Sequence, residues 1–122
     1  MKVAFCLKEN RADSPLDERF GRAGWFALTD GEEGRVLEII ENTARNEPSG
    51  AGSLAIQLLL DRGAGAIVAP EFGPKAYDAL KTLKLELFKQ GDHRTLAGAW
   101  QGWKTGTLAK ADQPGPAGLH RA

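Results

Sequence analysis

Cys6 and His93 carry the side chains best suited to ligating a metal. Cys6 lies near the end of the apolar run Lys2–Leu7, which predicts a buried strand. A thiolate is the natural ligand of an iron–sulfur cluster, although a lone cysteine in a strand is commonly a small buried hydrophobe. His93 begins an expected helix, and imidazole ligates metals at neutral pH, although an exposed histidine at a helix start is the commoner case. One cysteine per chain cannot hold a cluster alone, so ligation would need a homodimer or external ligands.

The stretch Arg19-Phe20-Gly21-Arg22 places two arginines on either side of a Phe-Gly pair. A guanidinium stays protonated and pairs with anions, so the two arginines are candidates for clamping an anionic ligand. The alternative is that both arginines are solvated while Phe20 fills the core. The nearby carboxylates are expected to be surface charges: Asp17, Glu18 and Glu71.

Two glycine-bearing turns, Gly50-Ala51-Gly52 and Gly73-Pro74, each lead into an expected helix. Glycine lets the backbone come close to a ligand, and free N–H groups at a helix start favour anions. Proline fits the first helical position, where its missing N–H costs nothing. Tight turns explain the same glycines equally well.

The hydrophobic pattern predicts the elements that position these residues. The expected strands are Lys2–Leu7, Trp25–Thr29, Arg35–Glu41, Ala66–Ala69 and Leu85–Phe88. The expected helices begin at Ser53, at Gly73-Pro74 and at His93, the last running to Trp103 and capped by Asp92.

The resulting order, β-β-β-α-β-α-β-α, predicts one α/β domain with a mixed five-stranded sheet and helices on both faces. The carboxyl ends of the first, third, fourth and fifth strands then share one edge. Ligands of open α/β sheets bind outside such an edge. The loops expected there are Lys8–Gly24, Asn42–Gly52, Glu71–Pro74 and Lys89–Asp92.

The composition narrows the classes of function. Sixteen Lys and Arg balance sixteen Asp and Glu, so no global field draws the chain to nucleic acid or to an anionic membrane. The single cysteine excludes an intramolecular disulfide, and no segment has the roughly 20 apolar residues of a membrane helix. A cytoplasmic protein is expected. Residues 1–108 form the expected domain, and residues 109–122, poor in large apolar side chains, an expected disordered tail.

Several short motifs together resemble a known family. They are Ser14-Pro15-Leu16-Asp17-Glu18-Arg19-Phe20-Gly21-Arg22-Ala23, Glu41-Asn42, Gly50-Ala51-Gly52, Phe72-Gly73-Pro74-Lys75-Ala76, Thr95-Leu96 and Gly106-Thr107-Leu108. In this order and spacing, over residues 1–108, they resemble the dinitrogenase iron–molybdenum cofactor biosynthesis family, which includes cofactor carriers and accessory proteins of nitrogenase assembly. The resemblance implies a ribonuclease-H-like fold and non-covalent binding of an iron–sulfur or iron–molybdenum cluster, without turnover. Carriers of the family often have histidine just before the Phe-Gly pair; here Arg19 stands there, and arginine does not ligate iron.

Two other functions compete with a carrier or accessory factor. Metal-dependent phosphodiester cleavage on a ribonuclease-H-like scaffold needs several carboxylates, one of them in the first strand, and Val3 to Leu7 offers none. A regulatory or scaffolding module could bind protein partners through Trp100 and Trp103, unless these pack on the sheet. We therefore expect a non-catalytic binding protein for a metallocluster or related anion, with the interaction module as the alternative.

Overall fold

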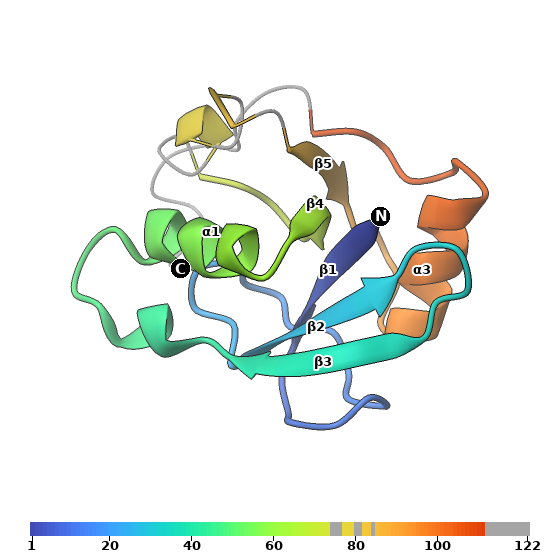
Figure 1. Cartoon of the computed structure of the whole chain (residues 1–122), viewed down its shortest axis with the longest axis horizontal. Helices are drawn as coiled ribbons and strands as arrows, with labels where there is room; N and C mark the ends of the chain where they lie inside the picture. Colours follow the sequence, from blue (N-terminus) through green and yellow to red (C-terminus); the bar gives the residue numbers. More distant parts are fainter. Residues whose placement is uncertain (74–76, 80–81, 84, 112–122) are drawn as a thin grey trace.

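The computed structural model describes residues 1–73, 77–79, 82–83 and 85–111. Its centre is a five-stranded sheet with the strand order β3-β2-β1-β4-β5 (Figure 1). The strands are β1 (Lys2–Leu7), β2 (Trp25–Asp30), β3 (Val36–Glu41), β4 (Ala64–Ala69) and β5 (Glu86–Lys89). The helices with described bounds are η1 (Thr43–Asn46, a 3₁₀ helix), α1 (Ala51–Asp61) and α3 (Leu96–Lys104).

The sheet is mixed, as the sequence predicted. β2 pairs antiparallel with both β1 and β3, whereas β1 and β4, and β4 and β5, pair in parallel. The carboxyl ends of β1, β3, β4 and β5 therefore lie at the same edge of the sheet. This confirms the predicted topology, in which the loops after these strands leave from one edge.

Apolar side chains pack on both faces of the sheet. Because neighbouring residues of a strand point to opposite faces, β1 sends Ala4 and Cys6 into one core cluster and Val3, Phe5 and Leu7 into another. α1 covers the first cluster and α3 covers the second, so the helices lie on both faces (Figure 1). A strand buried on both faces has a continuous apolar sequence, which is why the run at the start of the chain predicted β1 correctly.

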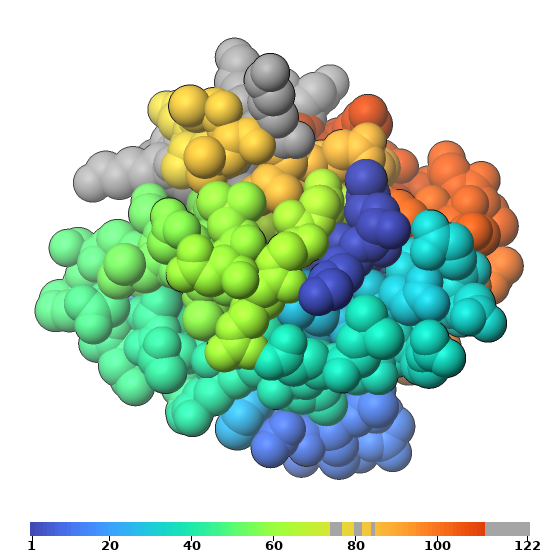
Figure 2. All heavy atoms as spheres, viewed as in Figure 1, coloured from blue at the N-terminus to red at the C-terminus, as the bar shows by residue number. Residues whose placement is uncertain are grey.

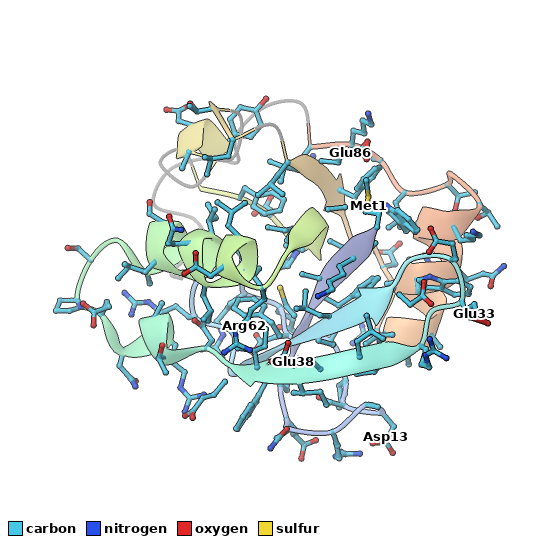
Figure 3. The ribbon with its side chains drawn as sticks, viewed as in Figure 1. Met1, Asp13, Glu33, Glu38, Arg62 and Glu86 are labelled. Carbon is cyan, nitrogen blue, oxygen red and sulfur yellow. The ribbon has the colours of Figure 1, made fainter. Side chains whose placement is uncertain are left out.

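The edge strand β3 is partly exposed and irregular. Its pairing with β2 shifts register between Leu28 and Thr29, and Leu37 is exposed. Such a bulge, together with charged side chains, protects a sheet edge from pairing with another chain. Arg62, just after α1, forms an ion pair with Glu38 of β3, which ties the helix to this edge (Figure 3).

The start of the chain lies against the β2–β3 turn. The amide of Gly31 donates to the carbonyl of Met1 over 2.9 Å. Figure 2 shows the first residues at the surface, between the start of β4 and the β2–β3 hairpin.

Two helix starts differ from the prediction. α3 begins at Leu96 and not at His93, because the Thr95 hydroxyl caps it by accepting a hydrogen bond from the Gly98 amide over 3.1 Å. His93 therefore precedes the helix, and Thr95 has the capping role predicted for Asp92. α1 begins at Ala51, two residues before the predicted Ser53. Residues 77–79 and 82 are helical, as expected for the second helix, whereas its predicted first residue, Pro74, lies outside the described residues.

The folded region extends beyond residue 108. Lys89 donates its amide to the carbonyl of Ala109 over 2.8 Å, and Ala111 donates to Leu87 over 3.0 Å. Residues 109–111, which the sequence assigned to the tail, thus pair along β5; residues 112–122 lie outside the described part. None of the helices described is long and apolar enough to cross a membrane.

Candidate anion-binding site

The loop after β1 turns back against the strand ends. Its amides donate to distant carbonyls: Lys8 to Pro15 over 3.1 Å, Leu16 to Arg94 over 2.9 Å and Asp17 to Cys6 over 2.8 Å. The tip of this loop, with Asp13, points away from the sheet (Figure 3). Its second half, from Asp17 onward, returns to the carboxyl edge and carries the predicted arginines.

The Phe20-Gly21 motif and the Gly50-Ala51-Gly52 turn contact each other through Gly21 and Gly52. A Cβ atom on Gly21 would lie 2.8 Å from the backbone nitrogen of Gly52 and 3.0 Å from its Cα. The Phe-Gly loop thus packs backbone to backbone on the first turn of α1. Gly21 serves this close packing, which is a structural reason for glycine at position 21.

Asn42 holds the same loop from the other side. Its fully buried amide donates to the carbonyls of Gly21 and Ala23, each over 2.9 Å, and accepts from the Ala44 amide over 3.1 Å. All the polar atoms of this side chain are used. Asn42 thereby joins the end of β3 to the arginine loop. In the sequence it stood out only as part of the Glu41-Asn42 motif.

Asp17 is a buried carboxylate and not the surface charge we expected. It is 2% exposed and accepts hydrogen bonds from the Arg19 amide over 3.0 Å, from Arg19 Nε over 3.1 Å and from Nη2 over 3.3 Å. The Gly24 amide donates to Asp17 Oδ2, the oxygen that also accepts from Arg19 Nη2, over 3.4 Å. This forked pairing raises the pKa of Arg19 and orients its half-exposed guanidinium.

An open cavity of about 310 Å³ lies beside this pair. Its lining comes from the arginine loop and from η1: Arg19, Arg22, Gly24, Arg45 and Asn46. The sequence prediction included Arg19 and Arg22 but missed Arg45 and Asn46. Three arginines line this cavity, a charge pattern that suits an anion, and we call it the arginine pocket.

Arg22 is the arginine of the pocket whose charge is not matched by a carboxylate in the described part of the chain. Its Nη1 donates to the carbonyls of Arg45 and Glu47, each over 2.6 Å. Arg45, by contrast, pairs with Glu41 at 3.5 Å and also donates to the Gly24 carbonyl over 2.8 Å. Backbone carbonyls fix Arg22 in place but leave its positive charge uncompensated. The pocket therefore favours a ligand with negative charge.

The model of the family described as "Dinitrogenase iron-molybdenum cofactor" matches residues 1–106. The chain belongs to this family. It is 38% identical over 91 residues to an uncharacterised protein from Methanocaldococcus jannaschii, a match that covers 73% of this chain and 74% of that protein. The ribonuclease-H-like assignment that accompanied the predicted family stays a prediction.

Two solved structures are similar over nearly the whole chain. The orange protein from Desulfovibrio gigas, in its apo form, has a TM-score of 0.86 and 28% identity, covering 94% of this chain and 96% of that protein. A putative NifB protein from Thermotoga has a TM-score of 0.78 and 25% identity, covering 96% and 98% of the two chains.

In this member of the dinitrogenase iron-molybdenum cofactor family, Phe20 belongs to the core. It is 4% exposed, and its ring centroid lies 5.1 Å from that of Phe72 and 5.8 Å from that of Phe26. Phe20 therefore anchors the loop between the two arginines, which agrees with the alternative interpretation of this motif. The flanking Arg19 and Arg22 remain at the pocket.

The two predicted metal ligands are not brought together. Cys6 is fully buried, its thiol lies 3.9 Å from the Val68 carbonyl, and burial, with a smaller contribution from Asp17, raises the pKa of the thiol above its ordinary value. His93 is exposed and lies on the side of the sheet covered by α3, where its imidazole approaches Gly98 and Gly102. Cys6 is thus placed in the core as a protonated thiol. No group of three or more His, Cys, Asp or Glu residues that could hold a metal occurs within the described ranges.

The remaining glycines of the prediction have different roles. Gly50 caps α1 in the left-handed conformation, with φ of 75°, which favours glycine. A Cβ on Gly73 would meet nothing within 4 Å, so packing does not explain a glycine there. Pro74, its predicted partner in ligand binding, lies outside the described residues.

Proposed function

We propose that this member of the dinitrogenase iron-molybdenum cofactor family is a non-catalytic carrier or accessory factor. Its cargo would be an iron–sulfur or iron–molybdenum type metallocluster, or a related anionic ligand. The observation that carries the proposal is the charge of Arg22, which pairs with no carboxylate of the described residues, beside Arg19 and Arg45 in an open cavity.

The residues present fit a cargo held by charge and hydrogen bonds. Arginine does not coordinate metals, because it has no free lone pair at physiological pH. Cys6 is buried and protonated, and among the described residues that line the pocket there is no cysteine or histidine. A cluster bound here would keep its own inorganic or organic ligands and present them as hydrogen-bond acceptors to the arginines.

The relatives support the same theme. The description of the family names the iron-molybdenum cofactor of dinitrogenase, and one similar structure is a putative NifB protein. The similar structure of the orange protein is of its apo form. We extend this theme to the arginine pocket of the present chain.

The interaction module is the weaker alternative, because the tryptophans that favoured it are used inside the fold. Trp100 Nε1 donates to the Gly31 carbonyl over 3.0 Å, and the Trp103 ring lies against the same glycine. Both side chains are half-buried against the β2–β3 turn. They hold α3 on the sheet and leave less surface for a partner.

Native mass spectrometry of anaerobically purified protein tests the proposal. Spectra are recorded before and after exposure to iron with sulfide and to a pre-formed iron–molybdenum or iron–sulfur cluster. We expect a discrete cluster-sized increase in mass, and the spectrum also shows whether one or two chains hold the cluster. Arg22→Gln should lose the increase, whereas Arg11→Gln, which removes the same charge from an exposed loop residue paired with Glu9 and Asp13, should keep it. No increase with any cluster would contradict the proposal.

A further inference from the structure

The two carboxylates that pair with arginines of the pocket are held in different ways. Asp17 is buried and accepts three hydrogen bonds from Arg19. The side chain of Glu41 is 53% exposed, and its Oε2 lies 3.5 Å from Arg45 Nη2, beyond the roughly 2.7–3.2 Å of an ordinary N–H···O hydrogen bond. Asp17 is therefore fixed in its pair, whereas Glu41 is able to turn into solvent.

Arg45 is held at the pocket by contacts that do not involve the Glu41 carboxylate. Its Nη1 donates to the Gly24 carbonyl over 2.8 Å, and its own carbonyl accepts from Arg22 Nη1 over 2.6 Å. These two hydrogen bonds run in opposite directions between η1 and the arginine loop. The carboxylate of Glu41 thus contributes charge to the pocket and is not needed to join the two segments.

The charge balance of the pocket decides how much negative charge it accepts. Two of its three arginines face the carboxylates of Asp17 and Glu41, whereas Arg22 pairs with no carboxylate of the described residues. One unit of negative charge on a ligand therefore balances the lining. A second unit finds a guanidinium only if Arg45 leaves Glu41. Because exposed ion pairs are weak, this exchange costs little.

We propose that Glu41 competes with the ligand for Arg45, and that the ligand is an anion with at least two negative charges. One charged group of the ligand pairs with Arg22 and another takes the guanidinium of Arg45, while Glu41 turns to water. An anion with a single charge is balanced by Arg22 and leaves the other pair in place. The inference rests on the proposed anion-holding role of the pocket and not on a metallocluster as the cargo.

Glu41→Gln tests the competition, because it removes the carboxylate charge and keeps the shape of the side chain. NMR titration of the full chain with sulfate at low ionic strength measures the affinity. We expect sulfate to bind about 3- to 10-fold more tightly to Glu41→Gln than to wild type. The gain should shrink as the ionic strength rises, since exposed charges are screened by salt.

Glu38→Gln is the matched control. It removes the same charge from the same strand, but Glu38 pairs with Arg62, and neither residue is among those that line the pocket (Figure 3). Its affinity for sulfate should equal that of wild type. A gain as large as that of Glu41→Gln would show that overall charge causes the effect and would overturn the competition.

Methanesulfonate tests the charge of the ligand, because it is close to sulfate in size and carries a single negative charge. Its affinity should rise less than about 2-fold in Glu41→Gln, since Arg22 alone balances it. An equal gain for methanesulfonate and sulfate would overturn the requirement for two charges.

The remaining outcomes separate this inference from the proposed function. If wild type binds sulfate and Glu41→Gln binds it equally or more weakly, the competition is overturned and the pocket stays an anion site. The expected gain for sulfate in a chain that takes up no cluster would support the competition and contradict the metallocluster cargo. Absence of sulfate binding by wild type and both variants would overturn the inference, and the cluster spectra then decide the proposed function separately.

Discussion

Gly21 and Gly52 contact each other through their backbones, with a Cβ on Gly21 placed only 2.8 Å from the Gly52 nitrogen. The contact joins the loop that carries Arg19 and Arg22 to the first turn of α1. Because real Cβ atoms do not approach a backbone nitrogen so closely, any side chain on Gly21 must push the loop and the helix apart. The position of the two arginines therefore depends on a glycine at position 21.

Gly21→Ala should lower the free energy of unfolding by about 1–3 kcal/mol, the usual cost of adding a methyl group where the neighbouring backbone cannot yield. Urea denaturation measures this change. Gly73→Ala is the matched control: its Cβ would meet nothing within 4 Å, so stability should stay the same or rise by up to about 1 kcal/mol. Equal losses in both variants would show that the contact between Gly21 and Gly52 is not tight.

Asn42→Ala should destabilise the protein more than the same substitution of a surface asparagine does. It removes the donors to the Gly21 and Ala23 carbonyls and the acceptor for the Ala44 amide. Since each orphaned buried polar group costs about 1–3 kcal/mol, we expect a loss of at least about 2 kcal/mol. Asn10→Ala, at an exposed loop position, should change stability by less than about 0.5 kcal/mol. A loss below that value for Asn42→Ala would mean that the amide does not hold the loop.

Periodicity and composition predicted the fold well, because the strands of this sheet have distinct apolar patterns. The apolar run of β1 and the alternation of strands and helices after β3 predicted the mixed sheet. The predicted strand bounds lie within two residues of those observed. The predicted start of α3 was wrong because His93 and Arg94 fit a helical pattern as well as a turn. Only the cap formed by the Thr95 hydroxyl decides where the helix begins.

The site was predicted in part, for a physical reason. Arg19 and Arg22 stand out because they flank a Phe-Gly pair, whereas Arg45 sits in a polar loop without periodicity and reaches the pocket only through η1. The burial of Asp17 depends on Arg19 and on the amide of Gly24, contacts that exist only once the loop has folded. Hydrogen-bond partners of this kind are tertiary and leave no local signal.

The buried thiol of Cys6 should make the free energy of unfolding fall as the pH rises into the alkaline range. Burial raises the pKa of Cys6 above its ordinary value, so the folded state keeps the proton while an unfolded-state thiol ionises above about pH 8.5. The stabilisation due to the protonated buried thiol is complete below that pH. It is lost at higher pH by up to about 1.4 kcal/mol per pH unit.

Cys6→Ala should therefore cost about 0.5–1.5 kcal/mol at pH 7, as for the loss of one methyl-sized group. The difference from wild type should shrink or reverse at pH 10. Urea denaturation at both values measures it, and native Cys6 should resist a thiol reagent until the chain unfolds. A difference that is the same at both pH values, or rapid labelling of the native thiol, would contradict the buried position.

The most direct test of the anion-carrier account is the affinity of the arginine pocket for a pre-formed cluster, titrated anaerobically into wild type, Arg22→Gln and Arg11→Gln. Loss of a charged hydrogen-bond donor predicts an affinity about 10- to 100-fold weaker for Arg22→Gln. Arg11→Gln and Cys6→Ala should bind like wild type, and unfolding curves should confirm that every variant is folded. Equal affinity of folded Arg22→Gln and wild type, or loss of binding in Cys6→Ala alone, would contradict an arginine-held anion and point to ligation by the thiol.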